Sequence, residues 1–302
     1  MIAPILAVAG VAVSLLVYSP DKPRAELEAA YPGAYSTVDG VRLRLRDTGP
    51  RNAPVVIMLH GFASSLDTWE PWAQQLSARY RVIRFDLPGF GLTGPDPTGD
   101  YSDDREIKIL ADLMNKLGIA RASLIGNSLG GRIAWNFAAQ HPNRVNRMVL
   151  ISPDGFASAG FEYDKTPETP LVMRALPYVT PRPLLRETLA AAYARPEALS
   201  DETVTRYHDL MLAPGVREAI LARMEQVRLR DPAPTLARIK IPTLLVWGEK
   251  DAMIPISNAD DFLRDLPHAK LVRLPDLGHV PFEENPAASL APVEDFLAGK
   301  TS

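Results

Sequence analysis

The sequence predicts an α/β fold in which helices cover both faces of a mostly parallel sheet and one helical segment is inserted late in the chain. Short runs that are apolar throughout alternate with amphipathic stretches, as expected for strands buried on both faces. One proline-broken stretch, residues 154–240, interrupts this alternation between two strand-like runs. Because structureless loops of that length are rare within a domain, we expect short helices that form a cap there.

The first predicted elements are a short helix and a hairpin. Residues 25–30 have the pattern of an amphiphilic helix, and residues 35–49 alternate apolar and polar side chains. Asp39-Gly40 divides this alternation into two strands, because the dipeptide suits a tight hairpin turn. Apolar runs predict the remaining strands at residues 55–60, 80–86, 122–125, 147–152, 242–248 and 269–274. Helical periodicity predicts helices at residues 69–79, 103–117, 132–140 and 286–298.

The predicted domain organisation follows from this order. Residues 21–153 and 241–302 form the α/β core, and residues 154–240 form the cap. Apolar pieces of the cap, at residues 171–179 and 210–214, either line a pocket or pack the cap onto the core; packing is the commoner role.

Composition excludes several classes of function. A chain of 302 residues can bury one large core. The net charge of −3 and the lack of a long basic run give no electrostatic reason to expect a nucleic-acid partner. The chain has no cysteine, no histidine pair at metal-ligand spacing and no phosphate-binding glycine loop. We therefore expect no disulfide, no metal and no cofactor.

The N-terminal segment differs from the rest of the chain. Residues 2–18 contain no charged side chain, and a helix of that length would reach about 25 Å, the short end of a membrane span. This favours an N-terminal membrane anchor that comprises residues 1–20. A cleaved signal peptide is the alternative, although a basic start and an Ala-x-Ala site are missing. Either role places the protein at a membrane or beyond it. Lys22 and Arg24 only weakly favour a cytoplasmic location for the chain that follows the segment.

Ser128 is the candidate nucleophile. It is the centre of a Gly-x-Ser-x-Gly pattern, with a strand-like run before it and a helical pattern after it. Such a strand-to-helix turn exposes the serine Oγ, and Gly126 and Gly130 lack the Cβ atoms that would clash there. An ordinary helix N-cap serine is the alternative.

A nucleophilic serine needs a base, and the base needs an orienting carboxylate. His279 follows the last predicted strand, and Asp251 follows the strand before it. Because parallel strands end at one edge of the sheet, these side chains should converge with Ser128 there. Glu249 and Asp154, which also follow strands, are alternative acids.

The transition state of acyl transfer also needs donors for a developing oxyanion. The backbone N–H groups of Phe62, in the loop after the first buried strand, and of Leu129, after the serine, are the expected donors. His60, in the same loop, is expected to be structural.

Other polar and aromatic residues have structural interpretations. Asp86 is expected to organise the backbone of the glycine-rich turn that follows it, and Asp276 to form a turn. Trp72 and Trp135 stand at core positions of predicted helices. The remaining histidines are expected near the surface, and they are His141, His208 and His268.

Five motifs in order carry a resemblance to a known family. They are HGFASSLDTW at 60–69, FDLPGFGLT at 85–93, GNSLGG at 126–131, the Gly248-to-Asp251 step and GHVPFEENP at 278–286. Together they resemble the α/β-hydrolase fold superfamily over residues 35–298. The apolar N-terminus and GNSLGG are similar to bacterial membrane-associated lipases and carboxylesterases.

The resemblance implies a serine hydrolase that cleaves small-molecule or lipid-like carboxylic esters. The order Ser128, Asp251, His279 matches the order of the catalytic triad in that superfamily, and the position of Asp251 favours it over the other acids.

The sequence is also compatible with two other functions. Asn127, before the serine, also resembles C–C bond hydrolases of ring-fission dienoates; those enzymes usually carry a tryptophan where this chain has Val280. The other is a binding protein that keeps the fold without catalysis, which the intact set of motifs argues against.

Overall fold

The structure is a computed structural model that describes residues 18–157, 162–165 and 168–300. Residues 2–17 of the expected N-terminal anchor or signal segment lie outside these described residues. Across the described ranges, no helix is both long enough and apolar enough to cross a bilayer.

One sheet forms the centre of the described chain. Its eight strands are arranged in the order β1-β2-β4-β3-β5-β6-β7-β8. β1 and β2 pair antiparallel, as do β2 and β4, and every pairing from β4 to β8 is parallel. The α/β fold with a mostly parallel sheet is therefore confirmed. The strands are β1 (Ala34–Val38), β2 (Val41–Thr48), β3 (Val55–Leu59), β4 (Arg81–Phe85), β5 (Ala122–Asn127), β6 (Val145–Ile151), β7 (Thr243–Gly248) and β8 (Lys270–Leu274).

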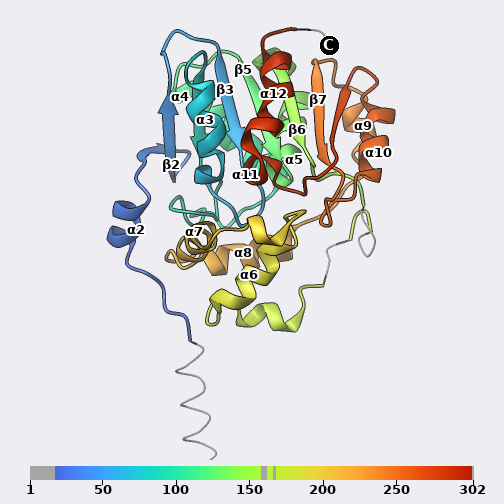
Figure 1. The fold of residues 1–302 in the computed structure, drawn as a ribbon. Coiled ribbons are helices and arrows are strands. Elements are labelled where there is room, and N and C mark those ends of the chain that lie inside the picture. The colour runs from blue at the N-terminus through green and yellow to red at the C-terminus, as the bar shows by residue number, and fades with distance from the viewer. Residues whose placement is uncertain (1–17, 158–161, 166–167, 301–302) are drawn as a thin grey trace, which may run out of the picture.

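Helices cover both faces of this sheet (Figure 1). Helices α3, α11 and α12 lie together on one face, while α5 packs on β5 and β6 from the other face beside α4 and α9. The core helices are α2 (Arg24–Ala30), α3 (Glu70–Leu76), α4 (Asp103–Lys116), α5 (Leu129–Gln140), α10 (Ser257–Asp265), α11 (Pro281–Glu284) and α12 (Pro286–Leu297), with 3₁₀ turns η1 (Leu66–Trp69) and η2 (Pro142–Arg144).

The central strands are apolar throughout because each face has its own hydrophobic core. Along β3, Ile57 and Leu59 join the core under α5, whereas Val56 and Met58 join the core that contains Trp72 of α3. Successive strand residues point to opposite faces, so a strand that is covered twice needs an unbroken apolar run.

Most predicted elements form within a few residues of their expected bounds. Asp39 and Gly40 make the hairpin turn with φ angles of 45° and 85°. Helix α5 begins at Leu129, three residues before the predicted start. The first turn was not predicted because Gly130 and Gly131 have low helix propensity. Helix α10 was not predicted; its nine residues bury only Asn258, Ala259 and Phe262.

The segment between β6 and β7 carries the inserted helices. They are η3 (Leu171–Ala175), α6 (Arg182–Ala190), η4 (Pro196–Ala198), α7 (Asp201–Met211), α8 (Val216–Gln226) and α9 (Ala233–Leu236). Figure 1 shows α6, α7 and α8 beyond the end of the sheet toward which the parallel strands point.

Two ion pairs, one part-buried and one buried, hold the inserted helices on the core. Arg206 of α7 pairs with Glu283 of α11, and Arg223 of α8 pairs with Glu106 of α4. The guanidinium of Arg223 also donates to the carbonyl oxygen of Pro88, 2.7 Å away. Because an unpaired buried charge is costly, these pairs fix where the helices lie on the core.

Asp86 organises the turn after β4, as expected. One carboxylate oxygen accepts the backbone N–H of Leu66 at 2.7 Å, and the other accepts that of Leu92 at 2.8 Å. The guanidinium of Arg44, on β2, lies 3.1 Å from the same carboxylate, and both side chains are 0% exposed. Asp67 shares this guanidinium at 2.8 Å. The buried charges therefore connect the hairpin to the two loops that follow β3 and β4.

We expect Asp86→Asn to lower the free energy of unfolding by about 3–5 kcal/mol, because it removes a charge from a buried pair and places an amide against two N–H donors. Urea unfolding measures the change. The control is Asp295→Asn, which breaks an exposed pair with Lys300 and should cost at most about 1 kcal/mol. Equal losses in the two variants would contradict the assignment.

Candidate active site

Ser128 occupies a strained turn between β5 and α5. Its φ of 51° and ψ of −119° are rare for a residue with a side chain. The side chain makes no cap hydrogen bond to the helix, so the N-cap interpretation does not hold. A Cβ at Gly126 would lie 2.2 Å from the carbonyl oxygen of Gly130, and one at Gly130 would lie 2.1 Å from that of Leu59. The turn therefore requires glycine at both positions.

His279 and Asp251 form a hydrogen-bonded pair. The imidazole Nδ1 lies 2.8 Å from one carboxylate oxygen of Asp251, and both side chains are buried. The other oxygen accepts the backbone N–H groups of Met253 and Ile254, each at 2.9 Å. An ionised carboxylate with both oxygens occupied holds Nδ1 as the donor, which leaves Nε2 of His279 free to accept a proton.

Ser128 and His279 line the same cavity, but within the described residues the serine hydroxyl makes no hydrogen bond to the imidazole. Catalytic hydrogen bonds are often long before a substrate binds, so this geometry is compatible with a nucleophile and its base. The backbone N–H groups of Phe62 and Leu129 donate to no protein group in the described chain and are available to a ligand.

The structure pairs none of the alternative residues with His279. Asp154 lies 3.4 Å from Arg132, and Glu249 is exposed. His268 is exposed as expected, but His208 is partly buried and its Nε2 bonds the carbonyl oxygen of Thr180 at 2.9 Å. Trp72 and Trp135 are buried, in agreement with core roles.

Asn127 has a positioning role that the sequence did not reveal. Its side-chain amide donates to the carbonyl oxygens of Ile151 and His279, each at 3.1 Å. The residue before the serine therefore connects the end of β5 to the end of β6 and to the histidine loop. Only the resemblance to other hydrolases had pointed to this position.

Glu284 is a second residue that sequence reasoning missed. Its carboxylate accepts the backbone N–H of Gly278 at 2.6 Å and that of Ala194 at 2.9 Å, and burial raises its pKa. The N–H of His279 also donates to the carbonyl oxygen of Ala192 at 2.8 Å. The loop that carries the histidine is thus held by the chain between α6 and α7.

His60 holds the loop that carries Phe62. Its Nε2 accepts the backbone N–H of Leu87 at 2.9 Å, so the proton is on Nδ1, which donates to the carbonyl oxygen of Gly61 at 2.8 Å. Burial lowers the pKa of His60 and keeps the ring neutral. The expected structural role of this histidine fits these contacts.

The cavity at Ser128 is almost entirely apolar. Its volume is about 320 Å³, and of the described residues that line it only His279 can carry a positive charge and none carries a carboxylate. Apolar walls come from the inserted helices and the segments beside them, and they include Leu176, Val179, Leu185, Leu189, Met211 and Ile220. Both apolar pieces of the expected cap therefore contribute to the lining.

Comparison with known proteins identifies the family. The alpha/beta hydrolase fold family matches residues 54–286, which is most of the chain. The chain belongs to the α/β-hydrolase family.

Similar members of this family have different activities. A 2-hydroxy-6-oxo-6-phenylhexa-2,4-dienoate hydrolase of Burkholderia cepacia is 29% identical over 85% of this chain and 91% of its own length. Lipase 1 of Psychrobacter immobilis is 28% identical over 76% and 72%. The crystal structure of a membrane phospholipase A, a bacterial virulence factor, has a TM-score of 0.77 and 26% identity, and covers 99% of this chain and 97% of that one.

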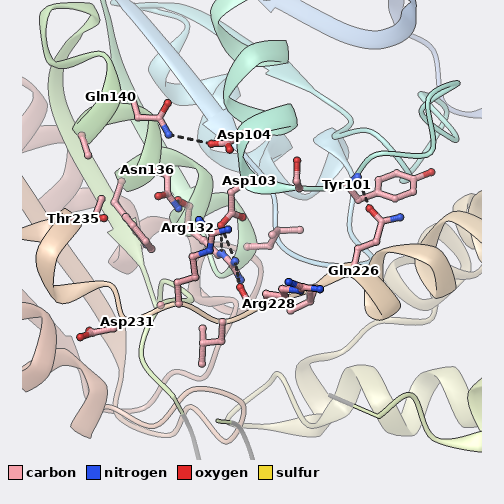
Figure 2. Close-up of a pocket in the computed structure, with 18 of the residues that line it drawn as sticks. Tyr101, Asp103, Asp104, Arg132, Asn136, Gln140, Gln226, Arg228, Asp231 and Thr235 are labelled. Carbon is pink, nitrogen blue, oxygen red and sulfur yellow. Dashed lines mark hydrogen bonds and ion pairs between the residues drawn. The ribbon is translucent and has the colours of Figure 1, made fainter. Parts of the chain in front are cut away.

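A second cavity of this α/β-hydrolase does not include the serine, although the adjacent Leu129 is part of its lining. Its volume is about 630 Å³, between α4, α5 and the chain after α8, and Figure 2 shows its charged lining. Arg132 reaches Asp103 at 2.7 Å and the carbonyl oxygen of Arg228 at 3.0 Å, while Gln140 reaches Asp104 at 3.4 Å. Acidic and basic groups are mixed here, and neither Ser128 nor His279 lines it.

We expect the contribution of His60 to stability to depend on pH. The ordinary pKa of 6.5 applies to the unfolded chain, and burial lowers the pKa in the folded one. Below about pH 6.5 the unfolded chain therefore binds a proton that the folded chain does not. As the pH is lowered further, the free energy of unfolding decreases by up to about 1.4 kcal/mol per pH unit.

Urea unfolding of the wild type and of His60→Asn between about pH 7.5 and 5.5 tests this linkage. Glu106 and Glu284 have raised pKa values and contribute with the opposite sign, but they are common to both proteins and cancel in the comparison. The wild type should lose more stability than His60→Asn as pH falls, while the exposed His268→Asn should follow the wild type. Parallel curves for the wild type and His60→Asn would exclude the neutral, buried imidazole.

Proposed function

We propose that the protein is a serine hydrolase of neutral, apolar carboxylic esters. The observation that supports this most directly is the strained Ser128 beside the hydrogen-bonded His279–Asp251 pair, at the wall of an apolar cavity. Strain at a serine that lines a cavity is characteristic of a nucleophile presented to a substrate.

In the proposed mechanism, Ser128 Oγ attacks the ester carbonyl carbon and its proton passes to Nε2 of His279. The N–H groups of Phe62 and Leu129 bind the resulting oxyanion. Collapse of the tetrahedral intermediate breaks the carbon–oxygen bond to the alcohol, which leaves with the proton from His279. Water then attacks the acyl-enzyme, with His279 as base, and releases the carboxylic acid and Ser128. Asp251 stays ionised and stabilises the imidazolium.

The cavity favours an uncharged acyl group. Burying a carboxylate without a cation or several N–H donors is costly, and the lining offers no lysine or arginine. An alkyl chain in this cavity instead gains about 0.8 kcal/mol for each buried methylene.

C–C bond hydrolysis of a dienoate is the second candidate. The similarity to the Burkholderia cepacia enzyme supports it, and both chemistries use a serine, a histidine and an acid. The substrate named for that enzyme is an anion. The uncharged lining and Val280 after His279 therefore favour the ester over the dienoate.

We further propose that residues 1–20 hold the protein at a membrane. The uncharged run at residues 2–18 supports this, as does the similarity to a membrane phospholipase A over 99% of the chain. The protein would then encounter a small-molecule or lipid-like ester substrate at the membrane surface.

We expect Ser128→Ala to lower kcat/KM for p-nitrophenyl butyrate by about 10⁴-fold or more, since no other group replaces the nucleophile. The control is Ser123→Ala, on the same strand but outside the cavity, which should keep wild-type activity. Turnover by Ser128→Ala within a few-fold of wild type would rule out the mechanism. Inactivity of the folded wild type on every ester, with turnover of a ring-fission dienoate, would favour the second candidate.

We expect kcat/KM for p-nitrophenyl esters to rise about fourfold for each added methylene until the cavity is filled. Leu185→Trp fills part of the cavity from α6 and should shift the optimum to shorter acyl chains with little effect on acetate. Glu187→Trp places the same side chain on an exposed position of α6 and is the matched control. The same chain-length profile for both variants would show that the acyl group binds elsewhere.

A further inference from the structure

The large hydrophobic side chains that are exposed on the described surface gather around one region of the molecule. Most belong to the inserted segment between β6 and β7, and Leu171 and Val172 are 77% and 75% exposed. The others belong to the N-terminal end of the described chain and to loops beside the active site. The whole set is Tyr18, Phe62, Leu171, Val172, Tyr178, Leu184 and Met253.

These side chains surround the mouth of the catalytic cavity. Phe62, Leu184 and Met253 are themselves part of its lining. Leu171 and Val172 directly precede Met173, and Tyr178 directly precedes Val179, and both of these following residues also line the cavity. Exposed apolar side chains thus predominate at the rim, where Arg174 is an exposed charged residue on the same 3₁₀ turn as Leu171 and Val172, and the rim is continuous with an apolar interior.

The N-terminal segment joins the molecule at this rim. The backbone N–H of Ser19 donates to the carbonyl oxygen of Tyr178 at 2.8 Å, and the N–H of Thr180 donates to the Ser19 hydroxyl at 3.0 Å. Arg217 holds the carbonyl oxygen of Ser19 at 2.6 Å. Figure 1 shows that the described chain begins on the side of the molecule where α6, α7 and α8 lie. The sixteen residues at 2–17, which contain no charged side chain, are therefore connected to the apolar rim.

We propose that this rim docks on the surface of a lipid bilayer, so that the mouth of the catalytic cavity opens into the acyl-chain region. An apolar patch at the mouth of a site is a recognised sign of interaction with a membrane or partner. The uncharged residues 2–17 favour a bilayer over a protein partner, because they join the described chain beside the rim and are themselves suited to an apolar lipid environment.

The consequence for substrate selection rests on the proposed ester hydrolysis. A lipid ester would pass from the bilayer into the apolar cavity without exposing its acyl chain to water. Esters packed in a membrane would then be preferred over the same acyl chain dispersed in solution.

The absence of cysteine from the sequence provides a direct test. Leu171→Cys and Tyr178→Cys each carry one environment-sensitive fluorophore on the rim. Asn115→Cys carries it at the exposed end of α4, next to the start of β5 at the opposite edge of the sheet. The full-length variants are reconstituted in phosphatidylcholine vesicles with and without doxyl-labelled lipid.

We expect blue-shifted emission and quenching by doxyl lipid at positions 171 and 178, and neither at position 115. Rim labels that stay water-like in vesicles would overturn the proposal. Rim labels that are shielded but not quenched by the lipid would also overturn it. Their shielding would then come from residues 1–17 if it does not depend on protein concentration, and from a second copy of the chain if it does.

A second measurement separates docking from catalysis. The double variant Leu171→Ser/Val172→Ser changes two rim residues that do not line the cavity. It should keep wild-type turnover of soluble p-nitrophenyl acetate and lose about tenfold of the turnover of a fluorogenic ester embedded in the vesicles. Equal activity of the double variant and the wild type on the embedded ester would count against docking. Failure of the proposed function would instead appear as Ser128-independent turnover, whatever the labels report.

Discussion

The close approach of β5, α5 and β3 at Ser128 is the constraint on which the rest of the site depends. Two glycines let the first turn of α5 pass within contact of the strand backbone, and the serine between them adopts a strained conformation. The two hydrophobic cores resist any relaxation of this turn, because they pack the strand and the helix from both faces of the sheet. The strain at Ser128 is therefore maintained by the packing of both hydrophobic cores, which involve many more residues than the turn itself.

The inserted helices contribute to the catalytic geometry as well as to the cavity. The chain between α6 and α7 holds the histidine loop, since Ala192 accepts the N–H of His279 and Ala194 donates to Glu284 of α11, while ion pairs fix α7 and α8 to the core. The same segment therefore provides a wall of the apolar cavity and supports His279. Separating this segment from the core would expose the cavity and release the histidine loop together.

Much of the fold could be predicted because its signals are local. Apolar runs marked the parallel strands, Asp39-Gly40 marked the hairpin, and the serine motif stood between a strand and a helix. Helix α10 was missed because it has only nine residues, most of them polar, so the stretch between β7 and β8 can equally be interpreted as a loop. Asn127 and Glu284 were missed as positioning residues because their partners are backbone groups far away in the sequence.

The sequence by itself determined the sheet, the family and two of the residues that we propose as the triad, Ser128 and His279, because each depends on a pattern within a few residues of chain. Only the tertiary structure showed that Asp251 reaches His279 while Asp154 lies against Arg132, which is the contact that supports Asp251 as the proposed acid. It also decided the charge of the cavity and the location of the apolar rim. These properties arise from side chains brought together from distant segments, and a one-dimensional pattern carries no record of that proximity.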